Sequence, residues 1–168
     1  TLETARQPLL YRVHEEPAPD KLEGLREVVE SVGLSLAKGQ VLQTRQINRL
    51  LDAAAGGEFS EMVNMSVLRS MTQAYYAPQN FGHFGLNLKR YAHFTSPIRR
   101  YPDLLVHRVI KAILQGKRYA LAGGRVSNAP ASGRRGLPPA PPSRDLSPQA
   151  QAWEAAGVHC SANERRAD

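Results

Sequence analysis

Hydroxyl and guanidinium side chains stand together in the segment YAHFTSPIRRYPDLLVHR, which spans residues 91–108. Thr95 and Ser96 precede the arginine pair Arg99 and Arg100, and aromatic residues flank this group on both sides. A guanidinium group presents its N–H donors as a planar fork that matches phosphate oxygens. Aromatic rings offer faces on which nucleobases stack. These residue types at this spacing predict the binding of a phosphate-bearing ligand.

The step from Ser96 to Pro97 is typical of a helix start, because a serine hydroxyl caps free backbone N–H groups and proline suits the first turn. Such a helix end attracts anions through its free N–H groups and the macrodipole. Arg99 and Arg100 would then lie where the dipole disfavours positive charge, so an anionic partner would explain them. Pairing of one arginine with a carboxylate elsewhere in the fold explains it equally well.

Positive charge is concentrated in residues 81–120, which we term the basic window. The window holds eight lysines and arginines and one acidic residue, Asp103, a net charge of +7, while residues 1–80 and 121–168 contribute −2 and +2. Aromatic residues lie in the same window, among them Phe81, Phe84, Tyr91, Phe94 and Tyr101. Cations interleaved with aromatic rings are typical of proteins that bind single-stranded nucleic acid. The alternative is a solvated basic helix whose aromatic residues belong to the core.

Other classes of site are not indicated by the sequence. The single cysteine, Cys160, excludes an internal disulfide framework, and we expect it to be a small buried residue. The five histidines lack the spacing of metal ligands, and Ser96 lacks the G-x-S-x-G surroundings of a hydrolase nucleophile. No apolar run approaches a membrane span and no signal-peptide pattern opens the sequence, so we expect a soluble, cytoplasmic protein.

Apolar residues at helical spacing predict three helices in the first half of the chain, at residues 19–33, 44–57 and 60–77. Asp20 is the expected N-cap of the first helix, and Gly33 its stop. The third helix is expected to end before Pro78, and its methionines to fill the core.

The period changes after residue 80. Alternation of Phe84, Leu86 and Leu88 predicts a short strand at 83–88. A helix at 101–116 is expected to bury the apolar residues Leu104, Leu105, Ile110, Ile113 and Leu114. The segment 123–146, with five prolines and four glycines, predicts a loop or insertion. The expected fold class is therefore α+β and helix-rich.

Two further helices are expected near the end of the sequence. One begins with Ser147 as N-cap and Pro148 at the first helical position. The other begins at Ser161, which stands in capping-box spacing with Glu164. The sequence ends within the second turn of that helix, which is too short to be stable alone. We therefore expect the chain to be part of a longer protein.

Three segments together resemble the catalytic (RNB) domain of the ribonuclease R and ribonuclease II family. They are LYRVHEEPAPDKLEGLREVVESVGLSL, LRSMTQAYYAPQNFGHFGLNLKRYAHFTSPIRRYPDLLVHRVIKAIL and GVHCSANERRAD. The similarity covers residues 9–116 and 147–168 nearly continuously, and HFTSPIRRYPDLLVHR is its most specific part. The resemblance implies that 1–122 and 147–168 belong to the C-terminal half of that domain, with 123–146 as an insertion.

The resemblance implies a processive 3′→5′ exoribonuclease, which hydrolyses single-stranded RNA to nucleoside 5′-monophosphates. In this family RNA enters a deep channel, and Mg²⁺ held by an aspartate cluster activates water. Phe84 is similar to an aromatic residue that stacks on bases near the 3′ end, and Arg165 or Arg166 to an arginine that stabilises charge on the scissile phosphate. The remaining RNA-binding residues implied are Tyr91, His93, Thr95, Ser96, Arg99 and Arg100.

The sequence also departs from the family pattern. The aspartate cluster lies upstream in the family, and no Asp-rich motif is present here. The first half of the catalytic domain and the flanking OB-type cold-shock and S1 domains are likewise absent. We therefore expect a few strands whose sheet is completed by missing upstream residues, and no hydrolysis by this chain alone. A non-catalytic single-stranded RNA-binding module and a poorly folding piece with half a core are the alternatives.

Overall fold

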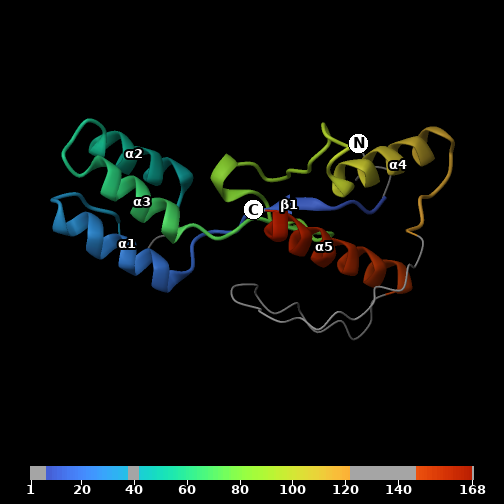
Figure 1. Cartoon of the computed structure of the whole chain (residues 1–168), viewed down its shortest axis with the longest axis horizontal. Coiled ribbons are helices and arrows are strands. Elements are labelled where there is room, and N and C mark those ends of the chain that lie inside the picture. Colours follow the sequence, from blue (N-terminus) through green and yellow to red (C-terminus); the bar gives the residue numbers. More distant parts are fainter. Residues whose placement is uncertain (1–6, 38–41, 122–146, 168) are drawn as a thin grey trace. The chain divides into compact units, whose positions relative to one another are not determined.

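A computed structural model describes residues 7–37, 42–121 and 147–167 (Figure 1). The elements are, in chain order, β1 (Tyr11–Val13), α1 (Pro19–Ser31), α2 (Thr44–Ala54), α3 (Ser60–Ser70), β2 (Tyr75–Ala77), the 3₁₀ helix η1 (Phe84–Leu86), α4 (Tyr101–Leu114) and α5 (Pro148–Ala167). β1 and β2 form a two-stranded sheet. The predicted helix-rich α+β class is confirmed.

The described residues fall into two compact units. Residues 12–74 and 81–91 hold α1, α2, α3 and η1, and we term them the three-helix unit. Residues 7–11, 75–80, 92–121 and 147–167 hold β2, α4 and α5, and we term them the two-helix unit. Each unit has its own cluster of buried apolar side chains.

In the three-helix unit, α1, α2 and α3 pack side by side (Figure 1). Their buried residues include Val29, Leu50 and Val63. α1 ends as the sequence predicts, because Gly33 has a φ of +78° and its N–H donates to the Glu30 carbonyl. Its predicted N-cap is wrong: the helix begins at Pro19, and Asp20 lies inside the first turn.

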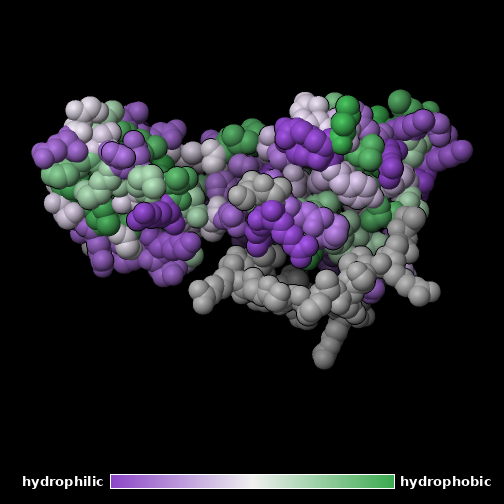
Figure 2. Space-filling view, in the orientation of Figure 1, coloured by the Kyte–Doolittle hydropathy of each residue, from purple (hydrophilic) through white to green (hydrophobic). Residues whose placement is uncertain are grey.

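α2 confirms the predicted start at Thr44, whereas α3 is shorter than predicted. α3 ends at Ser70, and the chain continues into β2, which the sequence analysis missed. The prediction that the methionines fill the core is wrong for Met62 and Met65, which are 40% and 42% exposed. Figure 2 shows hydrophobic residues open to solvent among the polar ones of this unit.

The strand predicted at 83–88 is wrong. The chain forms η1 there, and His83 and Leu88 pair in a single antiparallel bridge across it. Gly82 and Asn87 have positive φ values of 79° and 53°, which fold this segment back on itself. Alternating apolar residues therefore mark a tight turn here rather than an extended strand.

In the two-helix unit, α4 begins at Tyr101, as the predicted range 101–116 has it, but the helix start expected at Ser96 and Pro97 is wrong. Ser96 and Pro97 belong to a turn, and the first helical residue is Tyr101. The buried face of α4 consists of Pro102, Asp103, Leu105, Val106 and Val109. Leu105 is therefore predicted correctly, whereas Leu114 is wrong, since it is 82% exposed.

The C-terminal segment forms one helix instead of the two predicted. Ser147 caps α5 as predicted, since its hydroxyl accepts the Ala150 N–H at 3.3 Å. Ser161 starts no new helix; its hydroxyl donates to the Gly157 carbonyl and accepts the Tyr76 N–H, both at 2.8 Å. A Cβ at Gly157 would lie 2.7 Å from the Tyr76 carbonyl oxygen, so glycine allows α5 to approach β2 closely.

Two further predictions concern the proline-rich segment and membrane-spanning helices. The proline-rich segment 123–146 lies outside the described residues. Within the described part of the chain, no helix has the length and apolar character needed to cross a membrane.

Candidate RNA-binding interface

The segment from Thr95 to Arg100 forms a turn in the two-helix unit. The Ser96 carbonyl oxygen accepts the N–H groups of Arg99 and Arg100 at 3.2 and 3.0 Å. The Ser96 N–H donates to Asp103 Oδ2 at 2.7 Å. The predicted serine cap is therefore wrong: α4 has no side-chain cap, and Asp103 in its first turn bonds back to the Ser96 backbone instead.

The buried carboxylate of Asp103 holds this turn through hydrogen bonds. Its side chain is fully buried, and its Oδ2 also accepts a hydrogen bond from Arg100 Nη2 at 2.8 Å. Burial by itself raises the pKa of a carboxyl group. The hydrogen bonds from Ser96 and Arg100, with the charges of Arg100 and His93, outweigh it and hold the pKa of Asp103 below its ordinary value of 3.8.

The two adjacent arginines differ in what they contact. Arg100 is held by Asp103, which is the carboxylate pairing considered from the sequence. Arg99 is exposed, and no other described residue forms a hydrogen bond or ion pair with its side chain. Thr95 is exposed as well, and Ser96 is half-buried. The turn therefore offers one uncommitted guanidinium group and one threonine hydroxyl to a ligand.

His93 connects this turn to β2 and α5. His93 Nδ1 and the hydroxyl of Tyr76 are 2.7 Å apart in a hydrogen bond. The backbone N–H of the same tyrosine donates to Ser161 on α5. Tyr76 is 5% exposed, so this connection runs through the core of the unit. Positions 93 and 161, far apart in the sequence, are joined through one tyrosine.

Phe94 and His107 form an aromatic pair that sequence reasoning did not single out. Their rings stack at 4.3 Å with an interplanar angle of 6°. His107 Nε2 lies 2.9 Å from the Phe94 carbonyl oxygen, which can only accept, so this nitrogen carries the proton. Phe94 is 46% exposed, which leaves part of its ring open.

Phe84 and Tyr91 lie in the three-helix unit. Phe84 is half-buried and packs against the core of that unit, and its stacking on a base stays a prediction. The Phe84 carbonyl oxygen accepts the Thr44 hydroxyl at 2.8 Å. Tyr91 places its ring edge-on to His83, with 5.1 Å between the ring centroids.

Arg165 and Arg166 lie in the last turn of α5. Arg165 is half-buried and Arg166 exposed. Among the described residues, neither side chain has a hydrogen-bond or ion-pair partner. Positive charge at this end of a helix is favoured by the macrodipole, which is a structural explanation beside the catalytic one.

The described residues do not fit a Mg²⁺ site. No group of three His, Cys, Asp or Glu side chains in them is placed to hold a metal ion. Asp103 has its Oδ2 committed to Ser96 and Arg100. Cys160 is buried as predicted, and burial, with the charge of Glu164, raises the pKa of its thiol to about 11. A thiol with this pKa stays protonated at neutral pH and is a poor ligand or nucleophile.

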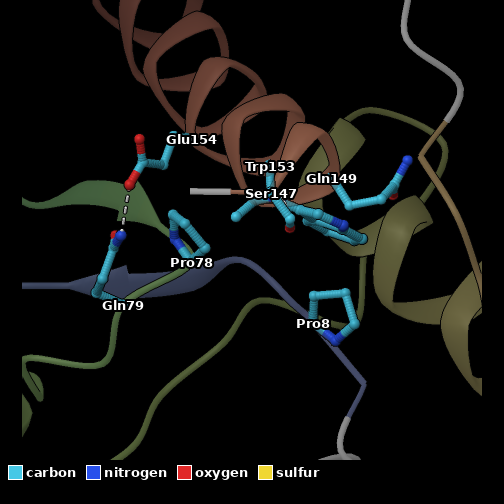
Figure 3. Close-up of a pocket in the computed structure, with 8 residues that line it drawn as sticks. Pro8, Pro78, Gln79, Ser147, Gln149, Trp153 and Glu154 are labelled. Atoms are coloured by element: carbon cyan, nitrogen blue, oxygen red, sulfur yellow. Dashed lines mark hydrogen bonds between the residues drawn. The ribbon is translucent and has the colours of Figure 1, made fainter. Parts of the chain in front are cut away.

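A pocket of about 280 Å³ lies elsewhere in the two-helix unit (Figure 3). Pro8, Pro78 and Trp153 line it, and Gln79 donates a hydrogen bond to Glu154 at its edge. None of the predicted RNA-binding residues lines this pocket. We therefore assign it no part in the interface.

Sequence reasoning missed Asp103 as the residue that shapes the turn. Its spacing of three residues from Arg100 was a usable signal, because such pairs often interact at a helix start. Tyr76 and Ser161 gave no such signal, since their contact joins residues 85 positions apart.

Comparison with known proteins gives the family. The RNB domain family matches residues 1–116. Ribonuclease R of Escherichia coli (strain K12) is 40% identical over 167 residues, which are 99% of this chain and 19% of the relative. Ribonuclease R of Vibrio parahaemolyticus is 49% identical over 113 residues, which are 67% of this chain and 14% of that relative. The chain thus spans less than a fifth of these curated relatives.

A solved structure agrees with these sequence matches. It is Mycoplasma genitalium RNase R in complex with ribose methylated single-stranded RNA, with a TM-score of 0.58 and 33% identity. The match covers 64% of this chain and 17% of that chain. The family match, the identities and the fold agree with the resemblance seen in the sequence, and this chain belongs to the RNB domain family.

Proposed function

We propose that this chain is the C-terminal half of the catalytic domain of a 3′→5′ exoribonuclease, which hydrolyses single-stranded RNA processively to nucleoside 5′-monophosphates. The observation that carries the proposal is membership of the RNB domain family together with the Thr95–Arg100 turn. The relatives it matches are named ribonuclease R. In this proposal residues 1–122 and 147–168 serve one domain, and 123–146 is an insertion.

The proposed grip on RNA combines charge and stacking. Arg99 and the Thr95 hydroxyl contact phosphate oxygens, while Phe84 and Tyr91 offer ring faces to bases. Arg100, His93 and Ser96 act mainly by fixing the turn, because each of them already has a hydrogen-bond partner. Arg165 or Arg166 stabilises charge on the scissile phosphate. Single-stranded RNA, as in the Mycoplasma genitalium complex, is the proposed substrate.

In this proposal the residues that hold magnesium lie outside this chain. When bound it would activate water for the hydrolysis. The carboxylates that hold it belong, we propose, to the upstream half of the catalytic domain, with OB-type domains as further partners. This chain alone is then expected to bind RNA without hydrolysing it. The cytoplasmic location stays a prediction.

The experiment pairs binding with activity. A fluorescent single-stranded oligoadenylate is titrated with the chain across a salt series. The same mixture is then assayed for nucleotide release after addition of about 5 mM Mg²⁺. Affinity that falls steeply with salt, without nucleotide release, is the expected result. Robust magnesium-dependent release would contradict the division of roles proposed here.

The parental reading frame gives a second test at little cost. An Asp-rich motif encoded upstream of Thr1 is expected if the proposal is right. A complete reading frame without it would favour the alternative, a non-catalytic RNA-binding module that uses the basic window alone.

A further inference from the structure

Two imidazole groups of the three-helix unit face the turn that carries Phe84. The Gly85 N–H donates to Nδ1 of His14 at 3.1 Å. The Leu86 N–H donates to Nδ1 of His83 at 3.3 Å. A backbone N–H can only donate, so each Nδ1 must be the unprotonated, accepting nitrogen of a neutral ring. Both contacts therefore require neutral histidine.

His14 also contacts Phe84 itself. The Phe84 N–H donates to the His14 carbonyl oxygen at 2.7 Å, and the two rings meet edge-on with 6.3 Å between centroids. The His83 ring lies edge-on to His14 at 5.0 Å. With the Thr44 hydroxyl on the Phe84 carbonyl, backbone and ring are fixed from several sides.

The absence of a side chain at Gly85 allows His14 to approach the turn closely. A Cβ at this position would lie 2.8 Å from His14 Nδ1. Any side chain at position 85 would therefore displace either the imidazole or the turn. Glycine here serves the approach of a ring to a backbone N–H, which is a direct packing reason for its presence.

The surroundings of His14 disfavour its charged form. Burial lowers the pKa of His14 below its ordinary value of 6.5, and the charge of Arg12 lowers it further, against a hydrogen bond with the Thr72 backbone that raises it. Besides Arg12, His83 is a titratable group that faces this ring, and it in turn faces Tyr91. The neutral ring needed to accept from Gly85 is thus the favoured form at neutral pH.

We propose that His14 and His83, as neutral imidazoles, are positioning residues that fix the Phe84 turn in the orientation in which the ring can meet a base. This inference deepens the proposed function and rests on it as far as RNA is concerned. Acid should then release the turn: a protonated Nδ1 cannot accept, so the Gly85 and Leu86 N–H groups would lose their partners.

The sign of the pH effect separates this proposal from plain electrostatics. Protonated histidines add positive charge, which by itself strengthens RNA binding. Positioning by neutral rings predicts the opposite, namely weaker binding below about pH 6.5, where histidine titrates.

The test uses four variants of the chain: His14→Ala, His83→Ala, His14→Asn and His83→Asn. The asparagine Oδ1 is as many bonds from Cα as Nδ1 and can accept the same N–H, but it does not titrate. NMR follows the amides of Gly85 and Leu86 and the ring of Phe84, and anisotropy follows a fluorescent single-stranded oligoadenylate. Phe84→Ala is the reference for lost stacking.

The alanine variants should shift these signals and weaken RNA binding about tenfold, within the range of one lost base stack. Each asparagine variant should stay within about twofold of the parent and show a weaker acid effect, since one of two titrating rings is gone. Unchanged Gly85, Leu86 and Phe84 signals in the alanine variants would overturn the proposal. If those variants unfold, the asparagine variants decide: acid sensitivity equal to the parent's would overturn it too.

Failure of the proposed function gives a different pattern. If the signals shift as expected but neither the histidine variants nor Phe84→Ala changes RNA affinity, the two histidines do position the turn. In that case it is the role of Phe84 in RNA binding that is wrong.

Discussion

The Phe84 turn of the three-helix unit and the Ser96–Arg100 turn of the two-helix unit differ in how their backbones are held. The first is fixed by uncharged acceptors, two imidazoles and a backbone carbonyl. The second is fixed by a buried carboxylate that bonds Ser96 and Arg100. Both turns carry residues proposed to meet RNA, one with a ring and the other with a guanidinium group.

The difference agrees with what each turn is proposed to present to RNA. A ring that stacks on a base needs a fixed orientation, and uncharged hydrogen bonds supply it without a strong local field. An arginine that meets phosphate must keep its own charge uncommitted. We term the Ser96–Arg100 turn the charged turn and the Phe84 turn the uncharged turn. In the charged turn Arg100 compensates the charge of Asp103, which leaves Arg99 open to a ligand. In the proposed function, Arg100 therefore serves the structure of the turn and Arg99 serves binding.

Removing Asp103 should give the largest effect. Asp103→Ala leaves Arg100 without its partner and the Ser96 N–H without an acceptor, so we expect a loss of about 3 kcal/mol in the free energy of unfolding. Urea unfolding measures this loss. The contact is charged and buried, so no comparable loss is expected from His83→Ala in the uncharged turn.

Asp103→Asn is the matched control. The amide oxygen can still accept the Ser96 N–H, but it carries no charge for Arg100, so an intermediate loss is expected. If both variants unfold at the parent's urea concentration, the buried carboxylate does not hold the turn.

Gly157→Ala tests the support beneath the charged turn. Its Cβ would meet the Tyr76 carbonyl at 2.7 Å, and Tyr76 also bonds His93. We expect a net loss of about 1–2 kcal/mol, because overpacking outweighs the gain in helix propensity. Urea unfolding, with the His93 NMR signals as a local readout, measures the effect.

Gly24→Ala is the control for this change in the other unit. Nothing lies within 4 Å of a Cβ there, and Gly24 is inside α1. The same substitution should therefore stabilise the chain by about 0.5–1 kcal/mol. Equal effects of the two substitutions would mean that α5 does not pack closely on β2.

Sequence patterns predicted the fold where local signals decide it. The start of α2 at Thr44, the glycine stop at Gly33 and the cap at Ser147 depend on neighbours within a few positions. Continuation of α5 through Ser161 could not be predicted in this way. It depends on Tyr76, 85 positions away, which satisfies the hydroxyl that would otherwise suit a helix start.

The candidate site, like the fold, could be predicted only where the signal is local in the sequence. Sequence alone identified the Thr95–Arg100 segment and the possibility that one of its arginines is paired with a carboxylate. It could not identify His14 as a partner of Gly85, because 71 positions separate them and no periodicity connects them. It also took the alternation around Phe84 for a strand, because hydropathy does not encode the positive φ of Asn87.

The two turns should also lose their support at different pH. The pKa of His14 is lowered in the fold, so its contribution to stability is complete above pH 6.5 and is lost as the pH falls below that value. The pKa of Asp103 is lowered from 3.8, so its contribution persists until the pH falls below about 4. Each step is no steeper than about 1.4 kcal/mol per pH unit for one proton.

Urea unfolding at a series of pH values from 8 downward, in roughly half-unit steps, measures both windows. His14→Asn should weaken the upper step and leave the lower one in place. A stability profile that is flat between pH 8 and about 4 would contradict the assignment of the upper window to the uncharged turn.

Arg99→Ala should have the smallest effect on stability and a specific effect on binding. The side chain is exposed and has no partner in the described part of the chain, so the free energy of unfolding should stay within about 0.5 kcal/mol of the parent. The slope of log affinity against log salt should fall by about 0.7, the value for one phosphate contact on a single strand. Arg100→Ala should show the reverse balance, a clear loss of stability with a smaller direct loss of phosphate contact, because its charge compensates Asp103. Equal salt slopes in Arg99→Ala and the parent, with a reduced slope in Arg100→Ala, would reverse the roles assigned to the two arginines.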